Sequence, residues 1–147
     1  MRDTFVRGYM AGVIGGIAMT IINQILFSLG FASSRFFDIS AMIYLGYVPN
    51  TIGEQFISEV IHLGHAALIG ISFAYIFPLI GRDYFVFKGA TFGAFIWSIV
   101  FGIGSLLKVP LFFNLSWISV ASYLFISATW GAVMSLSLVW FEEHAAK

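Results

Sequence analysis

Hydrophobic residues follow one another in four long stretches, and charged residues are confined to the short segments between them. The stretches without Asp, Glu, Lys or Arg are 8–34, 60–81, 89–107 and 109–141. A helix needs about 20 mostly apolar residues to cross the hydrocarbon core of a bilayer. Each stretch meets or approaches this length, so the pattern predicts four membrane-spanning helices.

Capping patterns and helix breakers set the ends of these helices. Residues 109–141 are too many for one straight crossing, because Pro110 disfavours helix at the preceding residue and Asn114 or Ser116 can cap a new start. Thr51-Ile52-Gly53-Glu54 is a capping box. We therefore expect an all-α fold, an integral membrane four-helix bundle that forms a single transmembrane domain over residues 1–147, with helices at about 6–30, 52–80, 85–108 and 115–141.

The first connection, residues 32–50, is the longest and is not polar. Apolar residues alternate there loosely with polar ones, which include Arg35 and Asp38. The pattern fits a short interfacial or re-entrant helix lying on the bundle. It fits a plain hydrophobic loop equally well.

The composition agrees with a membrane location and narrows the range of partners. Hydrophobic residues make up 60% of the 147 residues and charged residues only 10%, whereas soluble domains carry about 25% charged residues. Lys and Arg number 7, as do Asp and Glu, and no basic stripe is present to bind a nucleic acid. The chain has no Cys, which excludes disulfides and thiolate chemistry. The lipid bilayer is therefore the expected partner.

The distribution of basic residues predicts an orientation, because cytoplasmic loops of membrane proteins are enriched in Lys and Arg. With both termini inside, the outside receives only Arg35 and Lys108. The inside then receives the other basic residues, Arg2, Arg7, Arg82, Lys88 and Lys147. We expect a multi-pass membrane protein with both termini inside, and a solvated tail at Glu142 to His144.

Small residues recur at every fourth position on each predicted helix. Membrane helices associate through close backbone approach, which small residues permit. These faces either pack the helices of one chain together or form a seam between identical chains. The residues are Gly8, Gly12 and Gly16; Ala66, Gly70 and Ala74; Gly89 and Gly93; and Ser127, Gly131 and Ser135.

Two predicted helices begin alike, with Arg7-Gly8-x-x-x-Gly12 and Lys88-Gly89-x-x-x-Gly93. Both would start on the same side of the membrane. The match indicates two parallel hairpins related by an axis along the membrane normal. Chance similarity between glycine-rich membrane helices explains it equally well.

One polar group lies inside a predicted span, where ionisable residues are candidates for function. Glu59, His62 and His65 follow one another at steps of three, and Asn23, Gln24 and Glu54 are expected nearby. In a first interpretation, the histidines are neutral and hydrogen-bonded and only hold the bundle together. In a second, Glu59 and the histidines relay protons or cations. In a third, Glu59 and His62 bind a metal, although di-iron bundles need a second such pair.

No catalytic motif of a metalloprotease, serine hydrolase or phosphate-binding loop is present, and no cofactor is expected. The leading hypothesis is a structural or accessory membrane subunit that self-associates or belongs to a larger complex. The alternative is a small oligomeric transporter or channel with a Glu/His relay. An intramembrane metal-binding protein or enzyme comes third.

The arrangement of glycines and polar residues resembles small bacterial inner-membrane proteins of the YqhR and YagU type. The likeness rests on Arg7-Gly8-x-x-x-Gly12, Asp38, His65, Lys88-Gly89-x-x-x-Gly93 and Trp97. It spans most of the chain and implies a four-helix bacterial membrane protein without an established molecular activity. A link of YagU-like proteins to acid tolerance would agree with the relay but cannot be assigned to a residue.

Overall fold

The computed structural model describes residues 3–145 and is all-α over that range. Arg2 and Lys147, which contribute to the predicted orientation, lie outside the described residues. The predicted bundle is confirmed, with small shifts at the helix ends. The elements are α1 (Thr4–Ser28), α2 (Phe36–Tyr44), α3 (Ile52–Ile80), α4 (Phe85–Leu106), a 3₁₀ turn η1 (Pro110–Phe112) and α5 (Trp117–Ala145).

All four long helices are long and apolar enough to cross a membrane. They contain between 22 and 29 residues, and large apolar side chains are exposed along each of them. Exposed residues such as Ile21, Leu68, Phe95 and Phe125 are suited to contact with acyl chains. The chain is therefore a multi-pass membrane protein in contact with the lipid bilayer.

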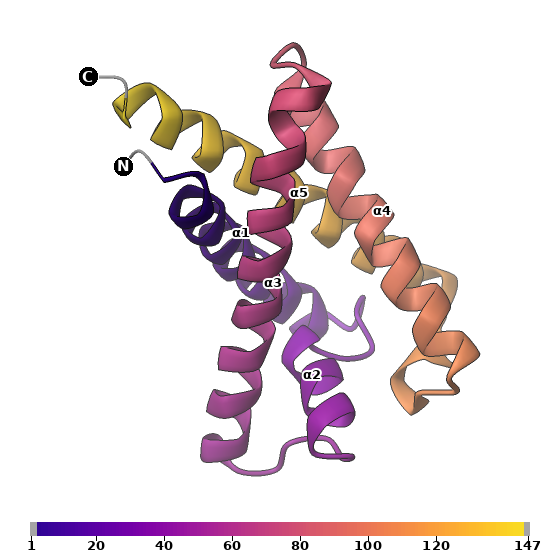
Figure 1. Ribbon diagram of the computed structural model, residues 1–147. Coiled ribbons are helices and arrows are strands. Elements are labelled where there is room, and N and C mark those ends of the chain that lie inside the picture. Colours follow the sequence, from indigo (N-terminus) through magenta and orange to yellow (C-terminus); the bar gives the residue numbers. More distant parts are fainter. Residues whose placement is uncertain (1–2, 146–147) are drawn as a thin grey trace.

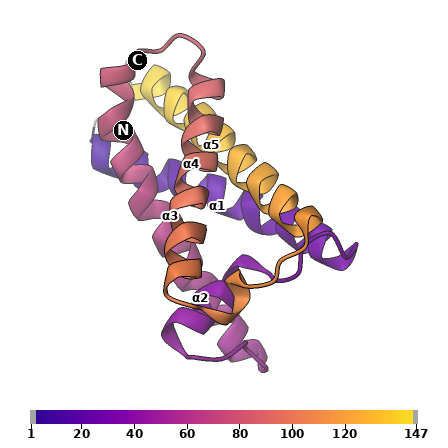
Figure 2. The same ribbon diagram turned by 90° about the vertical axis from the view of Figure 1, so that its right-hand side faces the viewer.

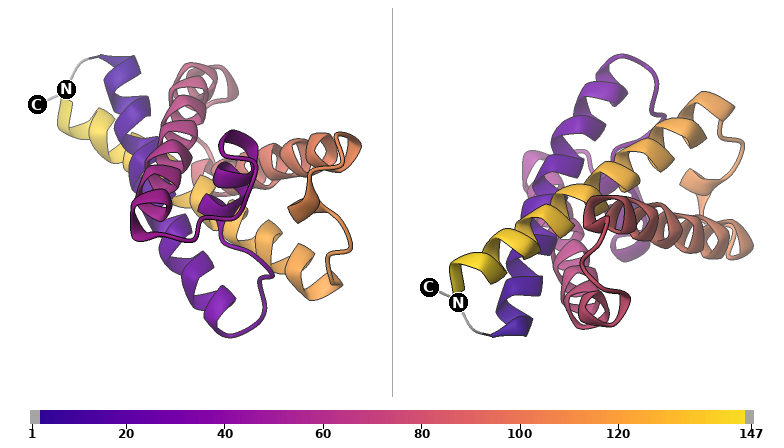
Figure 3. Two further views of the ribbon diagram at one scale, coloured as in Figure 1. Left: turned by 90° about the horizontal axis from the view of Figure 1, so that it is seen from below. Right: turned by 90° about the horizontal axis from the view of Figure 1, so that it is seen from above.

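The helices are splayed, and α1 and α5 cross each other at the centre of the molecule (Figure 3). α1 also packs along α3, and α4 packs along α5. The start of α1, the α3–α4 turn and the end of α5 lie at one end, whereas α2 and η1 lie at the other (Figures 1 and 2). α3 and α4 diverge from the turn that joins them, so the bundle is less tightly closed on that side (Figure 1).

The first helix–helix seam joins α1 and α3 through small residues. A Cβ atom built on Gly8 would lie 2.7 Å from the Cα atom of Ile71. One built on Gly12 would lie 2.8 Å from the Cα atom of Ala67. Gly70 faces the backbone of Gly8 and Gly12 from the other side. The two backbones are thus in direct contact, which only glycine permits.

The second seam joins α4 and α5 in the same way. A Cβ atom on Gly89 would lie 2.6 Å from the Cβ atom of Ser135, and one on Gly93 would lie 3.0 Å from the carbonyl carbon of Ser127. Gly131 packs against the backbone of both glycines. Each hairpin therefore sets two glycines of its first helix against a small-residue face of its second, as the predicted repeat requires.

The glycine faces are occupied within one chain. Even Gly16, one turn beyond the first seam, lies against α3, because a Cβ atom there would be 3.0 Å from the Cβ atom of Ala66. The packing interpretation of these glycines accounts for their position. They are not available for a seam between identical chains.

The first connection contains a helix, so the helical alternative is right. α2 has a capping box, in which the Asp38 carboxylate accepts hydrogen bonds from the Arg35 backbone N–H at 2.8 Å and from its guanidinium at 2.9 and 3.0 Å. The first six residues of α2, Phe36 to Ala41, are buried. α2 therefore inserts into the bundle beside α3 and does not lie loosely on its surface.

We predict that Gly12→Leu destabilises the protein, whereas Gly102→Leu does not. Leucine at position 12 must displace the backbone of α3, and overpacking of this kind costs about 1–3 kcal/mol or more. Gly102 lies about one turn before the end of α4, with nothing within 4 Å of an added Cβ atom. Thermal melting in detergent measures the difference. Equal melting and extraction of the two variants would show that the first seam does not depend on close approach.

Candidate functional site

The six polar residues singled out in the sequence do not form one cluster. Glu54 lies in the first turn of α3 and caps it. Its carboxylate accepts hydrogen bonds from the backbone N–H groups of Asn50 at 2.8 Å and Thr51 at 3.0 Å, and from the Tyr47 hydroxyl at 3.1 Å. These bonds hold the Glu54 carboxylate at the start of α3, and it makes no bond to either histidine.

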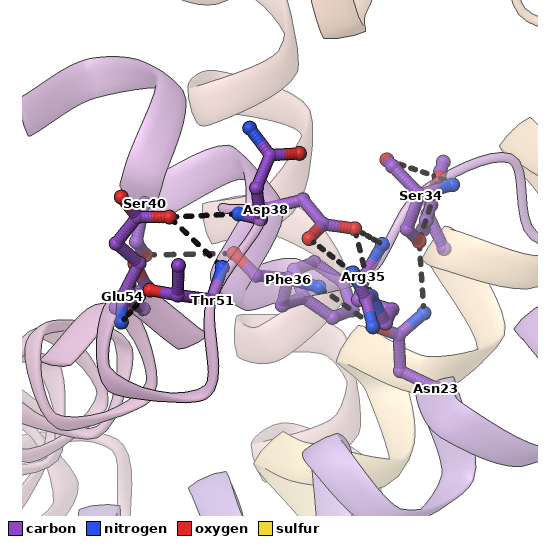
Figure 4. A network of polar contacts seen from close by, with 11 residues as sticks. Asn23, Ser34, Arg35, Phe36, Asp38, Ser40, Thr51 and Glu54 are labelled. Atoms are coloured by element: carbon purple, nitrogen blue, oxygen red, sulfur yellow. Dashed lines mark hydrogen bonds and ion pairs between the residues drawn. The ribbon is translucent and has the colours of Figure 1, made fainter. Parts of the chain in front are cut away.

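Asn23 lies in the interior and holds the connection to α2. Its Nδ2 donates to the Ser34 carbonyl at 3.3 Å, and its Oδ1 accepts from the Phe36 N–H at 2.7 Å (Figure 4). The side chain is 1% exposed, so both bonds are protected from water and lipid. Gln24, the next residue, is exposed on α1 and does not approach the histidines.

Tyr123 of α5 holds the same connection from the opposite side, although no sequence pattern singled it out. Its hydroxyl accepts from the Ser34 N–H at 2.8 Å and donates to the Ser34 carbonyl at 3.2 Å. It lies 3.1 Å from the Ser33 hydroxyl. Together, Asn23 and Tyr123 fix the start of α2 to α1 and α5.

The band of Glu59, His62 and His65 is divided between two neighbours. Glu59 faces α1, where the Thr20 hydroxyl donates to its Oε1 at 2.7 Å. Both histidines face α2. The His62 ring stacks on Phe36 with 5.6 Å between the centroids, and His65 Nε2 lies 3.0 Å from the Tyr44 hydroxyl.

This division weakens the relay and metal interpretations. Within residues 3–145, Glu59 makes no hydrogen bond to either histidine. In the same range no group of three or more His, Asp or Glu side chains comes together in a way that could hold a metal ion. Glu59 and His62 therefore lack further ligands. Glu59 Oε2 and His62 Nε2 are both buried and have no hydrogen-bond partner in the described chain.

A cavity of about 420 Å³ lies beside His62, between the diverging helices α3 and α4. We call it the α3–α4 cavity. Its walls are mostly apolar and include aromatic rings, and α2 forms part of them. The wall residues that matter below are Phe36, His62, Ile69, Ile96, Trp97 and Ser127.

A second polar group lies at the opposite end of the molecule, where α1 starts and α5 ends. Glu142 of α5 pairs with Arg7 at 3.7 Å and also with Arg82 of the α3–α4 turn. Its side chain is only 12% exposed. The prediction of a solvated tail is therefore wrong for Glu142, which ties three elements together.

Comparison of the chain with protein-family models, curated proteins and solved structures yields no match. A function is therefore inferred from the α3–α4 cavity and from the polar contacts around it. No sequence pattern singled out the residues that complete those contacts, which are Thr20, Tyr44 and Tyr123.

We predict that Tyr123→Phe loosens the connection to α2, whereas Tyr75→Phe does not. Loss of the Tyr123 hydroxyl leaves the buried Ser34 N–H without its partner, which costs about 1–3 kcal/mol. Tyr75 lies on α3 with 57% of its surface exposed and serves as the matched control. Faster proteolysis between residues 31 and 51 and a lower melting temperature are expected for the first variant alone. Equal behaviour of both variants would contradict the role of Tyr123.

Proposed function

We propose that this protein is a structural or accessory membrane subunit that does not conduct ions. The observation that supports this is that polar groups within the spans bond to nearby partners and do not form a continuous series. Asn23, Glu59 and His65 each bond to a local partner on a neighbouring element. Transport needs polar groups or water in a series that reaches both sides of the membrane. Separate local contacts do not supply one.

The half of the interior toward the α3–α4 turn is an apolar barrier. Phe73 and Phe77 of α3 and Met134 and Leu138 of α5 are at most 1% exposed and pack into one core. A proton that reached His62 would meet these side chains next. These four side chains carry no hydrogen-bonding group, and the neighbouring Ser135 hydroxyl donates to the Ala132 carbonyl of its own helix at 2.9 Å. The layer therefore blocks a relay toward that end of the molecule.

The proposed location is a bacterial plasma membrane with both termini inside. Arg7 and Arg82 meet at one end of the bundle, which agrees with the assignment of their segments to the same side. The excess of basic residues at that end favours the cytoplasm. An accessory role also requires a partner, either a second copy of the chain or a larger membrane complex. It would bind through the exposed apolar faces, since the glycine faces are occupied.

A small transporter or channel is the second candidate. The specific observation that favours it is the presence of two buried atoms without a partner in the described chain, Glu59 Oε2 and His62 Nε2. Unpaired ionisable groups inside a membrane are found in proton-transfer proteins. An intramembrane metal-binding protein or enzyme ranks below both, because no ligand set surrounds Glu59 and His62 in the region described.

We predict that proteoliposomes containing the purified protein conduct protons no faster than protein-free liposomes. The reason is the apolar layer around Phe73 and Phe77. A pH-sensitive dye trapped in the vesicles measures the flux. A flux that disappears in His62→Ala or Glu59→Gln, but persists in the control Gln24→Ala, would replace the accessory role with transport.

We predict that Lys108→Cys reacts with a membrane-impermeant maleimide added to intact bacterial cells, whereas Arg82→Cys does not. The natural chain contains no Cys, so each variant carries a single reactive thiol. Residues 82 and 108 are exposed at opposite ends of α4. Labelling after permeabilisation shows that both thiols are accessible. The opposite pattern in intact cells would reverse the proposed orientation.

A further inference from the structure

The α3–α4 cavity occupies the place of a helix contact that the other half of the molecule makes. Aligning the two seams matches Gly8 with Gly89 and Gly70 with Gly131. Counting from these glycines, Ile96 corresponds to Gly15 and Ile69 corresponds to Trp130. Gly15 and Trp130 form the close contact between α1 and α5, since a Cβ atom on Gly15 would lie 2.8 Å from Trp130 Cδ1.

The corresponding isoleucines do not close the gap between α3 and α4. Ile69 and Ile96 both line the α3–α4 cavity. The close contact of α1 with α5 cannot form between α4 and α3. Ile69 is shorter than the corresponding Trp130, and Ile96 carries a branched side chain where Gly15 has none. The cavity therefore follows from the sequence difference between the two hairpins.

Three buried residues in the walls of this cavity carry a polar atom without a partner in the described chain, namely His62, Ser127 and Trp130. Trp130 Nε1 lies on the side of α1, 3.1 Å from a Cβ atom built on Gly15. His62 is 7% exposed, and Nε2 has no partner within the described residues. Ser127 of α5 is 1% exposed, and its hydroxyl is likewise without a partner in that range. His65 also lines the cavity, but Tyr44 already occupies its Nε2. Buried polar groups in native proteins are nearly always paired, so the unpaired His62 and Ser127 in one cavity wall point to a ligand.

The other walls indicate the shape and polarity of that ligand. Phe36, Trp97 and Trp130 supply aromatic surfaces, which favour a flat ring. Ile43, Leu68 and Val100 are wall residues that are 56%, 62% and 42% exposed, so the cavity opens sideways to the lipid. A ligand could enter from the bilayer and leave an apolar tail between α3 and α4.

We propose that the α3–α4 cavity binds a lipid-soluble molecule with a ring that bears a carbonyl or hydroxyl oxygen, the chemical class of the membrane quinones. The ring oxygen bonds to His62 Nε2, and the tail extends into the lipid. The aromatic walls and the unpaired imidazole of His62 favour this class over a fatty acid, whose carboxylate would need a cationic partner. This inference concerns binding and holds whether or not the protein conducts ions.

Tryptophan fluorescence provides the test, because two of the four Trp residues line the cavity and two do not. In a Trp117→Phe/Trp140→Phe background in lipid vesicles that contain no other protein, Trp97 and Trp130 are the tryptophans that emit. We expect saturable quenching by decylubiquinone. 9,10-Dibromostearic acid, which quenches by its bromine atoms, serves as the acyl-chain probe and should quench without saturation.

Variants at the two histidines identify the hydrogen bond. His62→Phe keeps a ring against Phe36 but removes Nε2, and we expect it to weaken decylubiquinone binding about tenfold, the effect of one lost hydrogen bond. His65→Phe is the matched control and should change binding less than about twofold, since the His65 Nε2 is bonded to Tyr44. Ile96→Phe fills the cavity and should abolish saturable quenching. The melting temperature of each variant shows whether it is folded.

Four outcomes would overturn the proposal. The first is quenching by decylubiquinone that does not saturate. The second is saturable quenching by both probes with equal strength, which would make the cavity an acyl-chain site. The third is an equal effect of His62→Phe and His65→Phe on binding. The fourth is saturation that survives Ile96→Phe. If His62→Phe does not fold, the result for Ile96→Phe decides alone.

Discussion

Direct contact between helix backbones at the two small-residue seams determines where every other element can lie. In a bilayer, apolar side chains gain little by clustering, so helices associate where backbones approach closely. Gly12 against Ala67 and Gly93 against Ser127 provide that approach. Trp130 then fits against Gly15 where α1 and α5 cross. With three helix pairs fixed in this way, α3 and α4 are left apart, and the α3–α4 cavity results.

A second constraint concerns the backbone of α2, which is buried where water is scarce. The first N–H groups of a helix have no partner within it. Here side chains accept from the two N–H groups before α2 and from the first one within it. Tyr123 accepts from the Ser34 N–H, Asp38 accepts from the Arg35 N–H, and Asn23 accepts from the Phe36 N–H. Because the Arg35 guanidinium also pairs with Asp38 and lies over the Phe37 ring at 4.3 Å, its charge is balanced in this setting.

The apolar stretches and helix breakers predicted the spans because these depend on local sequence alone. The contacts of the candidate site depend on how the helices cross, which no spacing reveals. Glu59 and His62 point about 60° apart on an α-helix, and that angle directs one toward Thr20 of α1 and the other toward Phe36 of α2. The partners of Glu142 also depend on how the helices cross. The sequence therefore placed Glu142 in a solvated tail, whereas the fold pairs it with Arg7 and Arg82.

Most of the polar residues around the candidate site make a hydrogen bond that the fold needs, and His62 does not. Asn23, Tyr123 and Glu54 satisfy backbone groups, and His65 bonds to α2. His62 serves none of these purposes, although it lies on a wall that opens to lipid. The apolar layer of Phe73 and Phe77 separates it from the far end of the bundle. A group that is reachable from the bilayer but blocked toward that end is suited to holding a molecule dissolved in the membrane, and unsuited to passing an ion across it.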